Sequence, residues 1–349
     1  MLNLLPGIWT PLMHESMVRM GTWMPFEAAA RELTFHRGMT LDAETVRRNT
    51  ERAGRLSMPE QECVREHPQG AVPERQALSM DGSFVALNTK EWVEAKMLTV
   101  STVDGDGTCR NVSYFARTAP YFEFSKQMRG EIARRGVKHS AQVCVVADGA
   151  DWIQTVSSDH RPDAVRILDF YHSAERLAVV GHAVFDPDKT AFESWFHRQR
   201  RELRDGSPDS VLNELYRLSQ MLPKHAKLIG EHLEYFAKRR SQIEYAHFSQ
   251  SGWPIGSGSG EAAHKTVVQA RMKKAGMRWA LINVNPMLAL RALACNDRWE
   301  QTWSVIAKAS RKSSPAPSAA PVAQKLLPDT FQFKPVAGWR WDDRISTKS

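Results

Sequence analysis

Three carboxylates far apart in the chain, Asp81, Asp148 and Glu261, have the residue types and settings that metal-dependent phosphodiester chemistry needs. Asp81 lies near the middle of a segment that alternates like a strand, and Asp148 follows an apolar run. Glu261 follows the glycine-rich segment GWPIGSGSG, which allows a sharp turn. Two Mg²⁺ ions about 3.5–4 Å apart stabilise both the attacking and the leaving oxygen of an in-line transfer, and Mg²⁺ prefers carboxylate oxygens. We therefore expect these residues to be catalytic and to hold two Mg²⁺ or Mn²⁺ ions.

Two alternatives accompany this assignment. Asp81 and Asp148 each precede a glycine, and Asp-Gly is common in turns. Asp169 is the main alternative to Asp148, because Asp169 and His172 lie three residues apart at the end of an expected strand. That spacing suits a metal site, a hydrogen-bonded pair or a structural lock. We favour Asp148, because the second carboxylate of the expected fold lies on its fourth strand and Asp169 lies on the fifth.

Basic residues follow Glu261 along the same expected helix. They are Lys265, Arg271, Lys273, Lys274 and Arg278. A basic run is also typical of a solvated face, but beside a catalytic carboxylate we favour contact with the DNA backbone. For Trp253 and Trp279 we favour burial in the core over stacking on a flipped base, because Trp is generally well buried.

The segments around these residues predict an α/β core. Five of them have the alternation or apolar character of strands: QALSMDGSFVAL, EWVEAKMLTVSTV, TCRNVSYFART, AQVCVVADGADWI and AVRILDFYH. The turn VDGDGT joins the second and third, and the segment FEFSKQMRGEIARRG predicts a helix that ends at Gly136. The expected order is three antiparallel strands, a helix, a strand, a helix and a strand. This is the order of elements in an RNase H-like mixed sheet. The apolar fourth and fifth strands suit a sheet covered on both faces.

The segment before the sheet predicts two helices, PFEAAARELTFH and LDAETVRRNTERAG. Pro25 suits the first turn of the first helix, and Thr40 and Gly54 suit the start and the end of the second. The second helix would direct three arginines outward, namely Arg47, Arg48 and Arg52. This pattern favours a DNA-binding helix-turn-helix, with an ordinary helical hairpin as the alternative.

These elements divide the chain into five parts. They are an N-terminal helical, helix-turn-helix-like segment (1–70), the first part of the catalytic core (71–172), a charged helical insertion (173–250), the end of the core with the glutamate helix (251–308), and a linker with a flexible tail (309–349). The tail contains the low-complexity stretch SSPAPSAAPVAQ.

Composition agrees with a nucleic-acid partner. The 349 residues carry a net charge of +8, which favours polyanionic partners because phosphate contacts release counterions. The four cysteines form no C-x-x-C pair, which argues against a zinc ribbon. No apolar run reaches the roughly 18 residues of a membrane span. We expect a cytoplasmic, nucleoid-associated protein without a membrane partner.

Seven segments, in order over roughly residues 2–300, carry a resemblance to a known family: LLPGIWTP, LDAETVRRNTERAG, SMDGS, ADGADWI, LDFYH, PIGSGSGEAAHK and QARMKKAGMRW. Together they resemble the Kra-type bacterial insertion-sequence transposases, distant relatives of the Mutator superfamily. The resemblance implies a DDE transposase in which Asp81, Asp148 and Glu261 match the catalytic positions. Asp169 and His172 match the aspartate-x-x-histidine signature that follows the second catalytic aspartate in Mutator-like enzymes. The implied reaction nicks the ends of the element, and the freed 3′ hydroxyl then attacks target DNA.

Two departures from the family leave an alternative open. Family members usually carry more chain before LLPG, often with a cysteine-rich zinc-binding segment, so we expect a truncated N-terminus here. Gly260 stands before Glu261, where a larger residue is usual. The leading hypothesis is an active transposase that binds element ends and target DNA as a dimer or larger assembly, as the resemblance implies. The alternatives are a catalytically inactive DNA-binding remnant and, less favoured, a host RNase H-like nuclease such as a junction resolvase.

Overall fold

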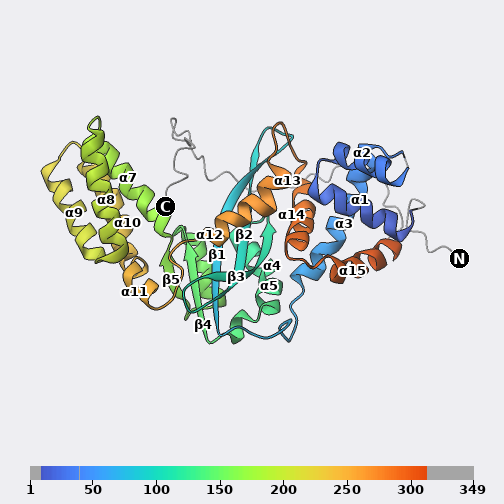
Figure 1. Cartoon of the computed structure of the whole chain (residues 1–349), viewed down its shortest axis with the longest axis horizontal. Coiled ribbons are helices and arrows are strands. Elements are labelled where there is room, and N and C mark those ends of the chain that lie inside the picture. The colour runs from blue at the N-terminus through green and yellow to red at the C-terminus, as the bar shows by residue number, and fades with distance from the viewer. Residues whose placement is uncertain (1–8, 39, 313–349) are drawn as a thin grey trace. The chain divides into compact units, whose positions relative to one another are not determined.

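A computed structural model describes residues 9–38 and 40–312, and its centre is a mixed sheet of five strands (Figure 1). The strands are β1 (Arg75–Ala86), β2 (Trp92–Val103), β3 (Cys109–Arg117), β4 (Gln142–Ala147) and β5 (Val165–Leu168). Their order in the sheet is β3-β2-β1-β4-β5. β1, β2 and β3 pair antiparallel, whereas β4 runs parallel to β1 and β5 parallel to β4. The predicted α/β class and all five predicted strands are confirmed. The linker and tail predicted from residue 309 lie almost wholly outside the described residues.

Helices cover both faces of the sheet. One face packs against α4 (Tyr121–Gln127), α5 (Arg129–Arg134) and α6 (Asp151–His160) around an apolar cluster that includes Leu78 and Val145. The sequence predicted one helix where α4 and α5 lie. A turn at Met128 instead separates two short helices, and Gly136, with a left-handed φ of 65°, follows the end of α5 as predicted.

The opposite face carries Ser79, Asp81 and Val146, and we call it the aspartate face. Its β1–β2 end is covered by a helical stretch of three parts: α12 (Gly258–Ala263), a π-helix (His264–Gln269) and α13 (Ala270–Met272). α14 (Leu281–Cys295) packs beside them and against β3. The predicted basic helix is therefore present in part: it begins at Gly258, contains a π-helical segment that the sequence did not predict, and ends at Met272. Lys273, Lys274 and Arg278 were expected on this helix and lie after its end.

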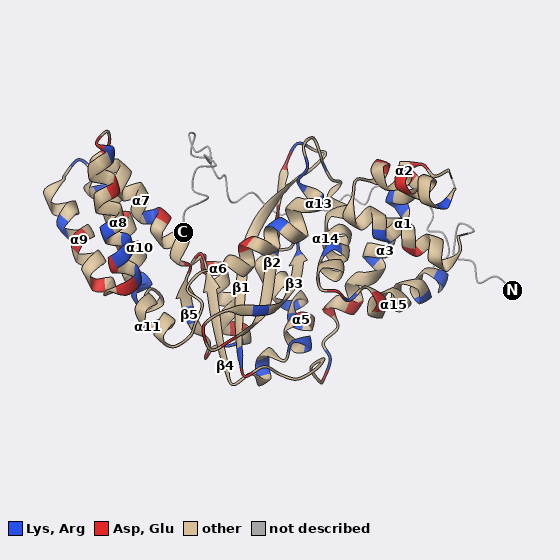
Figure 2. Cartoon of the chain, in the orientation of Figure 1, with Lys and Arg blue, Asp and Glu red and all other residues tan. Residues whose placement is uncertain are grey.

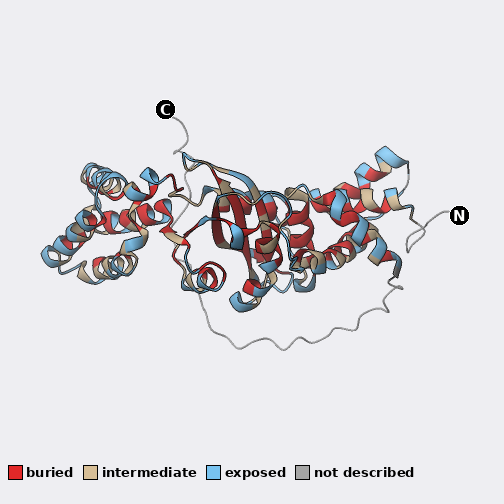
Figure 3. Cartoon of the chain, turned by 90° about the horizontal axis from the view of Figure 1, so that it is seen from below, coloured by how far each residue is buried: buried red, intermediate tan, exposed pale blue. Residues whose placement is uncertain are grey.

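The predicted helical insertion is confirmed as five helices, which lie beside the β5 edge of the sheet (Figure 1). They are α7 (Phe170–Phe185), α8 (Lys189–Asp205), α9 (Pro208–Met221), α10 (Ala226–Lys238) and α11 (Tyr245–Gln250). Buried Trp195, Leu215 and Phe236 join the insertion to the apolar cluster on the β4–β5 part of the aspartate face. The buried residues follow the inward sides of these helices, and the outward sides are exposed (Figure 3).

The N-terminal segment consists of α1 (Pro11–Trp23), α2 (Phe26–Arg37) and α3 (Ala43–Glu62). Two predictions about α3 are wrong. Asp42, not Thr40, caps it, because its Oδ1 accepts a hydrogen bond from the Thr45 N–H at 2.6 Å. Gly54 does not end it. Gly54 is buried within the helix, where an added Cβ would overlap the carbonyl oxygen of Pro286 on α14.

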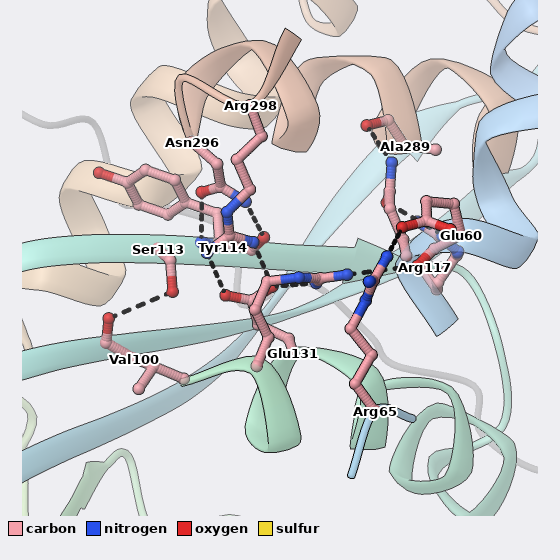
Figure 4. A network of polar contacts seen from close by, with 12 residues as sticks. Glu60, Arg65, Val100, Ser113, Tyr114, Arg117, Glu131, Ala289, Asn296 and Arg298 are labelled. Atoms are coloured by element: carbon pink, nitrogen blue, oxygen red, sulfur yellow. Dashed lines mark hydrogen bonds and ion pairs between the residues drawn. The ribbon is translucent and has the colours of Figure 1, made fainter. Parts of the chain in front are cut away.

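A polar network ties α3, α14 and α15 (Trp299–Lys312) to the sheet edge (Figure 4). Buried Glu131 accepts hydrogen bonds from Arg134 at 2.9 Å and from Arg298 at 2.6 Å. Burial alone would raise the pKa of Glu131, but Arg298 and Arg134 outweigh it and lower the pKa. Fully buried Arg117 donates to Glu62 of α3 at 2.9 Å. The N-terminal helices are thus anchored to the core by charged groups as well as by apolar packing.

Within the described residues, none of the helices is both long enough and apolar enough to cross a membrane. Charged residues of both signs are mixed along the helices of the insertion (Figure 2).

Candidate functional site

Three aspartates lie side by side at the carboxyl ends of the parallel strands. Met80 pairs with Ala147 in the β1–β4 register, so the next residues, Asp81 and Asp148, are neighbours. The Asp169 N–H donates to the Ala147 carbonyl at 2.7 Å and continues the register to β5. Because paired residues of adjacent strands point to the same face, the three aspartates share the aspartate face. The structure thus brings Asp81 and Asp148 together, as the strand order predicted.

Asp148 lies in a turn that holds its carboxylate toward this face. Its Oδ1 accepts a hydrogen bond from the Ala150 N–H at 2.9 Å, and Gly149 adopts a φ of 83° that favours glycine. Burial raises the pKa of Asp148, and the negative charge of Asp81 raises it further, against the hydrogen bond from the Ala150 N–H and smaller effects of His172 and Arg176. A half-buried carboxylate beside a second carboxylate is therefore disfavoured in its charged form unless a cation joins it.

The helical insertion clamps the same turn. The Tyr235 hydroxyl of α10 donates to the Asp148 carbonyl oxygen at 2.7 Å. The Arg239 guanidinium donates to the Gly149 carbonyl oxygen at 2.8 Å and lies 4.1 Å from the centre of the Tyr235 ring. Arg176 of α7 lies 3.5 Å from the centre of that ring. The insertion therefore fixes the backbone that carries Asp148, a role that the sequence did not reveal.

Asp81 is far more exposed than Asp169. Its side chain is 37% exposed, and its Oδ1 accepts a hydrogen bond from the Gly82 N–H at 2.6 Å. Its Oδ2 lies 2.9 Å from Nε2 of the buried His264. The sequence analysis did not consider His264 as a site residue, although it lies four residues after Gly260 and so on the same side of the helix.

Asp169 and His172 form a structural lock, one of the three possibilities that their spacing left open. Asp169 caps α7, accepting from the His172 N–H at 2.8 Å and contacting His172 Nδ1 at 3.0 Å. Its other oxygen accepts from the Ser257 N–H before α12. Burial alone would raise the pKa of Asp169, but the bonds from His172 and Ser257 lower it to about 2. The same bond raises the pKa of His172 to about 9, so the two form an ion pair at neutral pH. This engagement favours Asp148 over Asp169 as the carboxylate available to a cation.

Glu261 is not brought to the aspartates. Its side chain is 68% exposed and pairs with Lys265 Nζ at 2.8 Å. Gly260 faces the sheet instead, because an added Cβ there would lie 2.8 Å from Ser79 Oγ. Among the residues that the structure describes, no group of three or more His, Cys, Asp or Glu side chains is arranged to hold a metal ion. Of the three carboxylates predicted to lie together, Asp81 and Asp148 do so and Glu261 does not.

The predicted DNA-contacting residues after Glu261 have different environments. Arg271 is 1% exposed, donates to the Gly21 carbonyl oxygen and lies against the rings of Phe26 and Trp279. A guanidinium enclosed in this way cannot reach a phosphate, so we assign Arg271 to the core. The remaining four, Lys265, Lys273, Lys274 and Arg278, are exposed. Trp279 and Trp253 are buried, which confirms their expected place in the core.

The arginines predicted to face outward from α3 also differ. Arg47 binds two carboxylates of its own helix, Glu44 at 2.5 Å and Glu51 at 2.9 Å. Arg48 is 67% exposed and lies 3.8 Å from Glu44. Arg52 is half-buried. Of the three, Arg48 is the best placed to meet a DNA backbone.

Comparison with known proteins identifies no family. No protein-family model matches the chain, and no curated protein matches it. The functional argument therefore depends on the site itself and on the sequence motifs that surround it.

Proposed function

We propose that the chain is an RNase H-like DDE transposase, which cuts and joins DNA strands with divalent metal ions. The observation that carries this proposal is the position of Asp81 and Asp148, adjacent on parallel strands and directed to one sheet face. The sheet order β3-β2-β1-β4-β5, with the first three strands antiparallel, supports the RNase H-like assignment. The insertion after β5 and the glutamate helix α12 over the same face agree with it.

The aspartate pair fits a divalent cation. The pKa of Asp148 is raised by burial and by Asp81, which shows that the negative charge of the two carboxylates is not fully compensated. A bound cation would compensate it. Carboxylate oxygens are suitable ligands for both Mg²⁺ and Mn²⁺. Such ions, when bound, activate the attacking oxygen and stabilise the leaving oxygen of phosphodiester transfer. Glu261 would join the pair only after breaking its contact with Lys265.

Residues outside the aspartate pair would position the site and bind the DNA. Tyr235 and Arg239 fix the turn that carries Asp148, so its carboxylate keeps one direction during the reaction. Two exposed cations would contact the DNA backbone: Lys265, on the helical stretch over the aspartate face, and Lys274, just after its end. We propose double-stranded DNA, as element ends and target, for the substrate and a dimer or larger assembly on paired ends.

A second candidate function follows from the position of Glu261. If its carboxylate stays with Lys265, the site has two carboxylates rather than three, and the chain is a DNA-binding remnant of a transposase. Such a protein would occupy element ends without cutting them.

Labelled DNA that carries the ends of the encoding element distinguishes the two. Binding and nicking are measured with Mg²⁺ or Mn²⁺ and with EDTA, for the wild type, Asp81→Ala and Glu261→Ala. A transposase nicks the ends only with metal, and both variants bind but do not nick. Binding without nicking in every case would establish the remnant. Nicking that survives Asp81→Ala would contradict both candidates.

A further inference from the structure

His264 is a buried histidine beside the aspartate pair that lacks ordinary hydrogen bonds. Its side chain is 8% exposed, and Nε2 lies 2.9 Å from Asp81 Oδ2. Despite that proximity, neither ring nitrogen makes a hydrogen bond of acceptable geometry to any residue that the structure describes. Buried polar side chains nearly always have a partner, so an imidazole without a hydrogen bond next to a carboxylate requires an explanation.

The helix holds His264 in this position by packing. Gly260 lies against Ser79 of β1, and His264 follows one turn later, over Asp81, two residues further along the strand. Ala263 and Val267, on either side of His264, are fully buried in the cluster between the helix and the sheet. His264 is also the first residue of the π-helix, a distortion that is frequent at functional sites. The imidazole is therefore directed by the fold.

Glu261 has none of these properties. It lies three residues before His264, but its carboxylate is largely exposed and bound to Lys265. Of these two side chains, only His264 contacts an aspartate of the site, Asp81, in the free protein.

We propose that His264 supplies, through Nε2, the third ligand of the metal site that Asp81 and Asp148 begin, a set that the described residues do not hold in ligating geometry before an ion binds. This inference rests on the metal site of the proposed function and adds a residue to it. A neutral imidazole is a good ligand for Mn²⁺ and other transition ions, whereas Mg²⁺ prefers oxygen. The site of the free protein therefore prefers Mn²⁺ to Mg²⁺, and Glu261 is not needed for this first ion.

A purely structural histidine, which only pairs with Asp81, is the alternative. It would affect the folding stability and leave metal affinity and preference unchanged. The affinity for the ion in the absence of DNA therefore separates the two roles.

The test is calorimetric titration of the full chain with MnCl₂ and with MgCl₂, without DNA. The wild type is compared with His264→Ala, His264→Gln and His160→Ala. His160 is an equally buried histidine on α6, where Nε2 contacts Ser125 Oγ at 3.0 Å on the other side of the sheet. Circular dichroism identifies any variant that fails to fold, and His264→Gln keeps the volume and polarity of the site.

We expect the wild type to bind Mn²⁺ more tightly than Mg²⁺. Both His264 variants should lose about tenfold or more in Mn²⁺ affinity, with little change for Mg²⁺. His160→Ala should bind both ions like the wild type. Equal Mn²⁺ affinity in the wild type and His264→Gln would overturn the inference, as would a wild type that binds neither ion.

The outcome is separable from that of the proposed function. Metal-dependent nicking together with His264-independent Mn²⁺ binding would refute the inference and leave the transposase standing. His264-dependent Mn²⁺ binding by a protein that never nicks end DNA would support the inference and refute the transposase.

Discussion

Asp169 and His172 form an ion pair, so we expect the coupling free energy between these two side chains to depend on pH. Asp169 is almost completely buried, and its carboxylate fixes the start of α7 and the turn before α12 together. Replacing Asp169 by Asn, or His172 by Gln, removes one charge of the pair while keeping a polar group of similar size. We expect each substitution to lower the free energy of unfolding. The double variant should lose less free energy of unfolding than the sum of the losses in the two single variants.

The pKa shifts set the size and the pH range of this effect. The pKa of Asp169 falls from 3.8 to about 2, which corresponds to roughly 2 kcal/mol of stability. The His172 ring is one of three groups that contact this carboxylate, so we assign about 1 kcal/mol to the pair. The Asp169 contribution is present above pH 3.8 and is lost as the pH falls through about 2. The His172 contribution is complete below pH 6.5 and is lost as the pH rises through about 9.

A double-mutant cycle in urea, followed by circular dichroism, measures the coupling at about pH 5.5 and about pH 9.5. We expect about 1 kcal/mol at the lower pH and less than half of that at the higher one. The pair Arg161 and Asp163, with Nη2 and Oδ2 2.6 Å apart, is the control. This pair contains no histidine, so its coupling should be unchanged between the two pH values. The same Asp169–His172 coupling at both pH values would refute the charge-based explanation.

Three further substitutions test the packing of α3 against α14 and the hydrogen bond from Tyr235 to the turn that carries Asp148. Gly54→Ala should destabilise the protein by about 2 kcal/mol in urea unfolding, because the new methyl group overlaps the Pro286 carbonyl. Gly230→Ala, in a helix where an added Cβ meets no atom within 4 Å, should instead stabilise it by up to about 1 kcal/mol. Equal effects of the two would contradict the close approach of α3 and α14. Tyr235→Phe removes the hydrogen bond to the Asp148 carbonyl, so it should cost about 1 kcal/mol of stability and slow metal-dependent nicking without weakening DNA binding. An unchanged nicking rate would show that the clamp does not position Asp148.

The order of the strand-like segments and the alternation of apolar and polar residues within them were sufficient to predict the sheet. They also predicted that Asp81 and Asp148 lie next to each other. Both features are local in the sequence, and the parallel pairing of β1 and β4 then makes the two aspartates neighbours. α1 was missed although its signals were present: Thr10 caps it, Pro11 begins it, and Met17 belongs to its buried side.

Contacts between distant segments were not predictable. Gly54 is a typical helix end, and only the approach of Pro286 explains why α3 continues through it. A positive charge indicates a surface residue, yet Arg271 is buried, where the carbonyl of Gly21 accepts a hydrogen bond from its Nε and two aromatic rings contact its guanidinium.

The choice between Glu261 and His264 depends on how the helix is rotated about its axis. The contact of Gly260 with Ser79 sets that rotation, and it places His264 over Asp81 and leaves Glu261 at the side. Nothing in the sequence of α12 alone specifies this contact.

Single-turnover cleavage of labelled end DNA with Mn²⁺ tests the central claim most directly. The rate is compared among the wild type, Asp148→Asn and Asp169→Asn, at a temperature where all three are folded. We expect Asp148→Asn to lose on the order of a thousandfold or more in rate, because it removes a group of the reacting site. Asp169→Asn should keep most of the rate and lose stability instead. Cleavage that depends on Asp169 but not on Asp148 would contradict the account.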